Sequence, residues 1–252
     1  MELNQSPKIV RPRGIYLLPN LFTTAALFTG FYSIVAAMKG HFDIAAIAVF
    51  IAMIADGLDG RVARLTNTQT AFGAEYDSLS DMVAFALAPA LIVYSWSLSS
   101  LGKPGWLVAF VYTAATALRL ARFNTQVHDD DKRYFQGLPC PSAAAVIAGM
   151  VWCCTDYDIT GILIVIPAAM ITLFVAGLMV SRVRYYSFKQ VDLKGKVSFF
   201  AIVALVFILA AVALNPPEML FGIFLSYACS GPIVTLWQLR RVKQTKNRKT
   251  TE

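Results

Sequence analysis

The chain has 252 residues, of which 57% are hydrophobic and 15% are charged, and its mean hydropathy is +0.60. This composition excludes an ordinary soluble domain, in which about a quarter of the residues are charged. Several apolar runs reach the roughly 20 residues that a helix needs to cross a bilayer core. We therefore expect an all-α integral membrane protein with about eight transmembrane helices.

The expected spans follow one another closely, because apolar runs alternate with short polar connections. Their expected bounds are Ile15–Met38, Phe42–Leu65, Phe72–Trp96, Trp106–Phe123, Ser142–Thr155, Gly161–Val180, Val197–Leu214 and Met219–Leu239. Together they make one transmembrane domain over residues 15–239, between a polar N-terminal tail (1–14) and a basic C-terminal tail (240–252).

The formal net charge of +7 is distributed unevenly along the chain. With the spans above, all of the 22 Lys and Arg residues except Lys39 and Lys103 fall on one side of the membrane. Cytoplasmic loops of membrane proteins hold such an excess of basic residues. The pattern predicts a multi-pass protein of the inner (cytoplasmic) membrane with both termini in the cytoplasm. It also attributes the basic charge to topology and to membrane lipid rather than to nucleic acid.

Four carboxylates lie between two strongly apolar segments, at positions 56, 59, 77 and 81. The first two are three residues apart and the last two are four apart, so each pair lies on one face of a helix. Ionisable residues beside membrane-length apolar runs indicate a functional site. Two antiparallel helices joined by the short link TNTQT would bring the two faces together at the cytoplasmic edge of the membrane.

Four carboxylates that lie close together repel one another unless a cation lies between them. Their oxygen atoms suit hard divalent cations such as Mg²⁺ or Mn²⁺, and two such ions can hold the oxygens of a phosphoryl transfer. Gly60 and Gly73 on the same faces leave room for a ligand, and the guanidinium of Arg64 matches a phosphate. In the alternative, the acids only form ion pairs with Arg61 and Arg64, but their number and helical spacing disfavour it.

The segment DGLDGRVAR at residues 56–64, followed by Gly73 and the last two acids, resembles the CDP-alcohol phosphotransferase signature at all eight fixed positions. The resemblance implies a helical membrane enzyme. The residues implied to bind two divalent ions are Asp56, Asp59, Asp77 and Asp81. Asp81 is also implied to be the catalytic general base. The residues implied to border the CDP group are Gly60, Ala63, Arg64 and Gly73.

The flanking sequences narrow the resemblance to one branch of that family. The run RLARFN at residues 119–124 and the run FQGLPCPSAAA at residues 135–145 resemble the membrane-embedded bacterial phosphatidylserine synthases. This resemblance covers roughly residues 14–150. It implies CDP-diacylglycerol and L-serine as substrates. It is also compatible with a homodimer, because similar proteins are often dimers.

Polar residues in these flanks are candidates for substrate binding. Asn20 and Thr23, at the start of the first span, are expected to line the nucleotide pocket, unless they only form hydrogen bonds between helices. The expected acceptor-binding residues are Arg119, Arg122, Asn124, Gly137 and Pro139. For the two arginines, the alternative is that they anchor the span by reaching the lipid head groups.

Two other functions share parts of this pattern. A phosphatidylglycerophosphate or phosphatidylinositol phosphate synthase of the same family would take a phosphorylated acceptor, which requires more cationic residues in the pocket than serine does. An ion-coupled transporter is a more remote alternative, because it also contains intramembrane carboxylates. Transporters often show repeated halves and interrupted spans, and the sequence shows neither feature.

Overall fold

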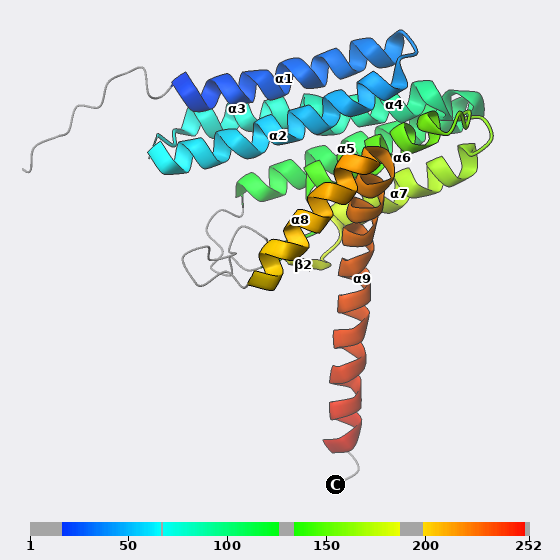
Figure 1. The fold of residues 1–252 in the computed structure, drawn as a ribbon. Helices are drawn as coiled ribbons and strands as arrows, with labels where there is room; N and C mark the ends of the chain where they lie inside the picture. The colour runs from blue at the N-terminus through cyan, green and yellow to red at the C-terminus, as the bar shows by residue number, and fades with distance from the viewer. Residues whose placement is uncertain (1–16, 67, 126–133, 187–198, 250–252) are drawn as a thin grey trace, which may run out of the picture.

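The computed structural model describes residues 17–66, 68–125, 134–186 and 199–249, and the predicted N-terminal tail lies outside them. The described chain is almost entirely helical, which confirms the all-α fold class (Figure 1). The α-helices within residues 17–125 are α1 (Leu17–Met38), α2 (Phe42–Thr66), α3 (Ala71–Asp81), α4 (Ala88–Trp96) and α5 (Lys103–Thr125). Those within residues 134–249 are α6 (Cys140–Asp156), α7 (Val165–Val180), α8 (Phe199–Leu214) and α9 (Pro216–Lys249).

The helices α3 and α4 form one continuous rod, because the π-helical segment η2 (Met82–Leu87) joins them without a break. A short 3₁₀ segment, η3 (Leu98–Leu101), then leads into α5. With α3, η2 and α4 counted as one helix, the helices occur in the same order as the predicted spans. Within the described residues, four helices are long and apolar enough to cross a membrane: Leu18–Met38, Ala71–Trp96, Lys103–Thr125 and Pro216–Thr235. The apolar helices α6 and α7 are shorter.

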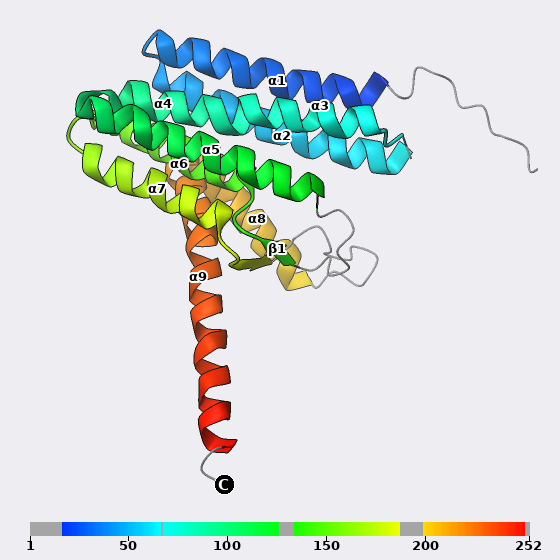
Figure 2. The ribbon, with the colours of Figure 1, turned by 180° about the vertical axis from the view of Figure 1, so that it is seen from behind.

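The helices α1 and α2 form an antiparallel pair, and α6 lies deep in the bundle (Figures 1 and 2). The turn between α1 and α2 contains Gly40, whose φ of +80° is a conformation that glycine adopts without strain. Every residue from 143 to 151 in α6 is buried, and many of them are alanine. Small side chains allow helices to approach closely without a large aromatic core. This packing holds α2, α6 and α9 together at the centre of the molecule.

A two-stranded antiparallel pair, which the sequence did not predict, joins the loop before α6 to the loop after α7. Its strands are β1 (Tyr134–Gln136) and β2 (Arg184–Tyr186), with Phe135 opposite Tyr185. The buried Tyr185 donates a hydrogen bond to the carbonyl oxygen of Ala228 in α9 at 2.8 Å. Its ring lies where a Cβ at Gly231 would be, so this glycine permits the contact between α9 and the strand pair.

The last helix is longer than the predicted eighth span and takes its own direction. Figures 1 and 2 both show α9 leaving the bundle and running across the long helices rather than along them. Its helical backbone continues to Lys249, through most of the stretch assigned to the basic tail. The site described below is built from the first part of the chain, whereas α9 is in contact with α6 and with β2.

Candidate metal centre and adjoining cavity

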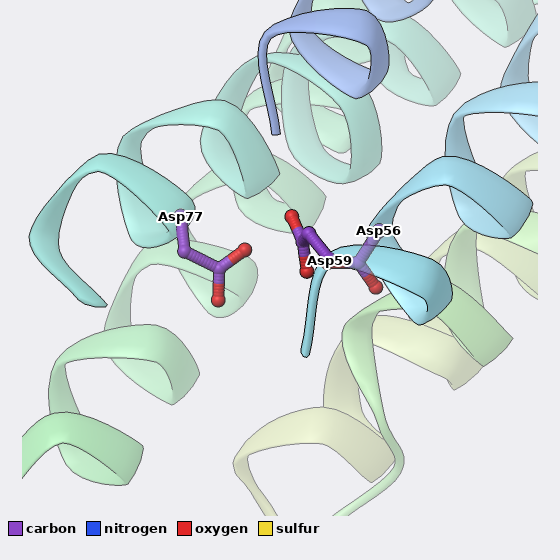
Figure 3. Close-up of side chains that lie close together, drawn as sticks. All are labelled: Asp56, Asp59 and Asp77. Atoms are coloured by element: carbon purple, nitrogen blue, oxygen red, sulfur yellow. The ribbon is translucent and has the colours of Figure 1, made fainter. Parts of the chain in front are cut away.

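Three of the four predicted metal ligands meet where the end of α2 faces α3. Asp56 and Asp59 come from α2 and Asp77 comes from α3, and their carboxylates gather in one place (Figure 3). One oxygen from each lies within 4.8 Å of the others. Two oxygens on opposite sides of a Mg²⁺ ion are about 4.2 Å apart, since each bond is about 2.1 Å long. The three side chains therefore fit a shared divalent cation with little rearrangement.

The fourth carboxylate, Asp81, lies one helical turn after Asp77, at the end of α3. It shares a side-chain hydrogen bond with Asp56 and lies within electrostatic reach of the other two acids. Two carboxyl groups in contact require a shared proton or a nearby cation, because two bare negative charges repel. The structure thus brings all four acids together, with Asp81 joined to the three-residue set through Asp56.

The start of α3 is fixed by a side-chain cap. Thr70 has extended backbone angles (φ −128°, ψ 153°), and its Oγ1 accepts a hydrogen bond from the N–H of Gly73 at 3.0 Å. Such a cap satisfies one of the free N–H groups at a helix start. It fixes where α3 begins after the link, and therefore which face of α3 presents Asp77 to α2.

A chain of buried hydrogen bonds ties α1 to the carboxylates. The hydroxyl of Thr23 lies 2.7 Å from Oδ2 of Asp59, to which it donates. The hydroxyl of Ser80 in α3 donates to the carbonyl oxygen of Thr23 at 3.1 Å. Asp59 is only 6% exposed, so its charge depends on such partners. The start of α1 therefore orients a carboxylate of α2 and also holds α3 in place.

A cavity of about 220 Å³ adjoins the carboxylates where α1, α2 and α3 meet. Its lining includes all six predicted nucleotide-binding residues, which are Asn20, Thr23, Gly60, Ala63, Arg64 and Gly73. Asp59 and Asp77 also line it, so the cavity opens directly onto the candidate metal centre. The structure thus assembles in one place residues that lie more than 50 positions apart in the sequence.

The sequence did not identify five further residues of this cavity as site residues. They are Pro19, Thr68, Gln69, Thr70 and Ala74. Most come from the TNTQT link, which reads as a plain polar connection in the sequence. The one available signal was Thr70, because a threonine before an apolar helical run is typical of a helix start.

The two glycines of the cavity border polar side chains. A Cβ at Gly60 would lie 3.6 Å from Nη1 of Arg64, which is an ordinary contact. A Cβ at Gly73 would lie 3.1 Å from Oγ1 of Thr70, which is tighter than most real contacts. Arg64 is also within electrostatic reach of Asp59. Arg64 therefore lines the cavity together with Gly60 and Asp59.

Among the predicted acceptor residues, Arg119 contacts Cys140 at the start of α6. Its Nη1 lies 3.0 Å from Sγ of Cys140, and Cys140 is within electrostatic reach of Asp81. Tyr227 of α9 is within electrostatic reach of Arg119. Nε of Arg119 is buried and forms no hydrogen bond with the part of the chain that the structure describes. Arg119 thus presents a buried donor in the interior of the bundle.

The other four acceptor candidates have contacts of their own, and none of the five lines the 220 Å³ cavity. Nη1 of Arg122 donates to the carbonyl oxygen of Val180 at 3.4 Å, and Nδ2 of Asn124 donates to Oγ of Ser78 at 3.0 Å. Gly137 has a φ of +80°, and a Cβ there would collide with the carbonyl oxygen of Met179.

Pro139 occupies the N-cap position of α6, directly after this tight turn. Gly137 and Pro139 therefore fix how the chain enters the buried helix α6. Asn124 is tied to α3 next to Asp77 through its bond to Ser78, whereas Arg122 reaches the end of α7. The structure thus divides the predicted acceptor set into residues close to the carboxylates and residues that hold the fold.

Comparisons with known proteins give the same family over most of the chain. The model of the CDP-alcohol phosphatidyltransferase family matches residues 16–179. A CDP-diacylglycerol–serine O-phosphatidyltransferase of Helicobacter pylori is 39% identical over 238 residues, which cover 93% of this chain and 97% of that protein. One of Mycobacterium leprae is 31% identical over 91% of this chain and 78% of its own. An archaetidylserine synthase of Methanothermobacter thermautotrophicus is 34% identical over 67% of this chain and 69% of its own.

The fold and the site define a helical membrane protein with a carboxylate cluster that can hold divalent cations beside a ligand-sized cavity. The chain belongs to the CDP-alcohol phosphatidyltransferase family. This family membership confirms the resemblance carried by the signature at residues 56–81, and with it the prediction of a phosphatidyltransferase. The helices α8 and α9 lie beyond the residues that the family model matches, although the relative from Helicobacter pylori extends over them.

Proposed function

We propose that this protein transfers the phosphatidyl group of CDP-diacylglycerol to the hydroxyl of L-serine, giving phosphatidylserine and CMP. The observation that carries the proposal is the similarity to the Helicobacter pylori serine phosphatidyltransferase, which extends over 93% of the chain. The relatives from Mycobacterium leprae and from an archaeon also have names that specify a serine lipid. A phosphorylated acceptor is the competing proposal within the same family.

The cavity beside the carboxylates is the proposed site of the CDP group. Its polar lining comes from Asn20, Arg64 and the first turn of α3. The backbone N–H groups at the start of a helix form a binding site for an anion such as a phosphate. Ala63 and the two glycines have small side chains or none, so the nucleotide can approach the backbone of the cavity wall. The diacylglycerol chains would then extend from the cavity into the surrounding lipid.

Asp56, Asp59 and Asp77 are the proposed ligands of Mg²⁺ or Mn²⁺, with Asp81 completing a site for two ions. The mutual approach of these carboxylates supports this assignment, because the acids would otherwise repel one another. When bound, such ions supply the positive charge that neutralises a pyrophosphate during phosphoryl transfer. The carboxylates in turn hold the site at the edge of the cavity.

Asp81 is the proposed general base, because the family resemblance implies this role and because it lies in the carboxylate cluster at the end of α3. It accepts the proton of the serine hydroxyl as the hydroxyl oxygen bonds to the phosphorus that bears diacylglycerol. The bond from that phosphorus to the phosphate of CMP breaks, and CMP leaves. Arg64 stabilises the charge on the departing nucleotide.

Arg119 is the proposed partner of the serine carboxylate, because its buried Nε has no hydrogen-bond partner among the described residues and lies outside the lining of the nucleotide cavity. The excess of basic residues on one side supports a cytoplasmic location for this site in the inner membrane, where serine is available. A homodimer stays a prediction of the family resemblance.

The acceptor can be tested directly with the purified protein. CDP-diacylglycerol and Mg²⁺ or Mn²⁺ would be offered with serine, glycerol 3-phosphate or inositol phosphate in separate reactions, and CMP release would be measured. We expect CMP release in the reaction with serine and none in the reactions with the two phosphorylated acceptors. Release only with a phosphorylated acceptor would contradict the serine proposal and keep the family, whereas release with none would contradict the proposed activity.

A further inference from the structure

We propose that Tyr112 is a positioning residue for Asp81: its buried hydroxyl holds the π-helical turn that directs the Asp81 carboxylate toward the cluster. The proposal deepens the proposed function and rests on it, since Asp81 is the general base there. It is carried by a set of contacts in α5, η2 and α4 that the sequence motifs did not indicate.

The π-helical segment η2 begins with the residue after Asp81. At its end the N–H of Ala88 bonds to the carbonyl oxygen of Val83, five residues earlier, rather than to the residue four earlier. Such a turn adds one residue to the helix and is often found at functional sites. One residue corresponds to a rotation of about 100° around the helix axis. The turn therefore sets the face on which Asp81 lies relative to the anchored helix α4.

The cause of this turn is Pro89 in the first turn of α4. A proline inside a helix has no N–H for the carbonyl four residues earlier, and its ring collides with that carbonyl. The carbonyl in question is that of Phe85, which lies in η2. Widening the helix to a π turn relieves the collision but leaves the Phe85 oxygen without its ordinary helical donor.

Tyr112 supplies the missing donor. Its hydroxyl donates to the carbonyl oxygen of Phe85 at 2.8 Å, and both side chains are fully buried. A buried carbonyl without a donor is strongly unfavourable, so this bond favours the widened turn over its alternatives. Phe85 lies four residues, or about one turn, after Asp81. The hydroxyl of α5 thus fixes the turn directly behind the carboxylate.

The segment η2 is also held by α1. A Cβ at Gly30 would lie 2.6 Å from Cα of Ala84, so the two backbones touch with no side chain between them. The same helix α1 carries Thr23, which orients Asp59. The contacts with Gly30 and Tyr112 together restrict rotation of η2. We infer that they also set the position of Asp81 relative to the other acids.

The test must separate positioning from plain stability. In Tyr112→Phe the Phe85 oxygen loses its donor, so both the position of Asp81 and the stability of the fold are at risk. In the double variant Tyr112→Phe/Pro89→Ala, residue 89 regains an N–H that can satisfy Phe85 in an ordinary α-helix. That change restores stability without restoring the π turn. Tyr94→Phe is the matched control, because it also removes a tyrosine hydroxyl but lies in α4, after Pro89.

Four quantities would be measured for each variant: the melting temperature, kcat and KM for serine-dependent CMP release, and the Mn²⁺ concentration that gives half of the metal-induced rise in melting temperature. For Tyr112→Phe we expect kcat to fall about 10- to 100-fold, as misplacement of a reacting group by about 1 Å can do, with the KM for CDP-diacylglycerol within about twofold. We expect its Mn²⁺ midpoint to rise at least about threefold, because Asp81 belongs to the cluster. The double variant should melt close to the wild type and keep the low kcat.

Recovery of kcat together with melting temperature in the double variant would overturn the proposal, because Tyr112 would then act only through stability. Wild-type kcat and Mn²⁺ midpoint in Tyr112→Phe would overturn it as well. The metal midpoint does not depend on serine transfer. A wild-type protein that releases no CMP with serine would therefore contradict the proposed function alone, while the Mn²⁺ midpoints would still decide whether Tyr112 positions Asp81.

Discussion

The hydroxyl of Thr23 lies 2.7 Å from Oδ2 of Asp59 and joins the first helix to the carboxylate cluster. The same hydroxyl lies 3.2 Å from the carbonyl oxygen of Pro19, but its single proton is directed best toward the shorter, charged contact. Asp59 is almost completely buried, so this bond determines how its carboxylate is presented. A residue predicted to contact the nucleotide thus also orients a metal ligand.

Replacing Thr23 should therefore weaken metal binding. We expect Thr23→Val to raise the Mn²⁺ concentration needed for half-maximal activity about 10-fold, as loss of a hydrogen bond to a metal ligand commonly does. Thr23→Ser keeps the hydroxyl and should stay near the wild type. A metal titration of CMP release compares the two. An unchanged metal requirement in Thr23→Val, with a raised KM for CDP-diacylglycerol, would instead assign Thr23 to the nucleotide alone.

Divalent ions should stabilise the folded protein, because they remove the repulsion among the acids of the cluster. A ligand that binds only the folded state stabilises it by about 2.7 kcal/mol at 100 times its dissociation constant. We expect Mn²⁺ to raise the melting temperature of the metal-free wild type. In EDTA, Asp56→Asn should melt above the wild type, since it removes one repelling charge, and it should respond little to Mn²⁺.

The control for this experiment is Asp43→Asn, because Asp43 is an exposed acid in the first turn of α2, far from the cluster. It should respond to Mn²⁺ as the wild type does. A wild-type melting temperature that is the same in EDTA and in excess Mn²⁺ would contradict the metal assignment.

Arg119 should act on the acceptor rather than on the donor. Arg119→Lys keeps the positive charge but loses the planar pair of donors that matches a carboxylate. A charge-assisted hydrogen bond contributes about 1.5–3 kcal/mol, so we expect the KM for serine to rise about 10-fold or more. The KM for CDP-diacylglycerol should stay near its wild-type value. Initial rates at varied serine and varied donor distinguish these two effects.

Arg122→Lys is the matched comparison, because Arg122 reaches the carbonyl oxygen of Val180 instead of the interior. Its effect on the KM for serine should be clearly smaller. An equal or larger effect at Arg122 would move the acceptor site toward the end of α7.

Gly137→Ala should affect stability more than serine binding. The alanine would be forced to a φ of +80°, and its Cβ would meet the carbonyl oxygen of Met179. A strained backbone of this kind contributes about 1–3 kcal/mol of destabilisation, so we expect a lower melting temperature. Gly177→Ala in α7 is the control, because a Cβ there meets nothing within 4 Å. A raised KM for serine at wild-type stability would instead support Gly137 as an acceptor contact.

The carboxylate cluster was predictable because helical spacing is local information. Asp56 and Asp59 share one helix face, and so do Asp77 and Asp81, and a short link forces those faces together. The structure confirms this proximity. The six residues expected at the nucleotide also line one cavity, because residues such as Arg64 and Gly73 lie on the same two faces as the acids, and their binding role stays a prediction.

The features that the sequence did not predict depend on contacts between distant segments. The π turn at residues 82–87 needs both Pro89 and a hydroxyl from α5, and helical periodicity does not reveal either contact. The strand pair joins loops about 50 residues apart, and three-residue strands give no alternating pattern. The direction of α9 likewise depends on its packing against α6 and Tyr185, since apolar content alone indicates only that a helix can span a membrane.

Isotope-labelled serine tests the central claim most directly. Purified protein would be incubated with CDP-diacylglycerol, Mn²⁺ and ¹³C-serine, and the lipid product and CMP would be quantified together. The proposed function predicts labelled phosphatidylserine and CMP in equal amounts, and neither product from Asp81→Asn. CMP release without label in the lipid would contradict the proposed transfer to serine. Undiminished phosphatidylserine formation by Asp81→Asn would contradict Asp81 as its base.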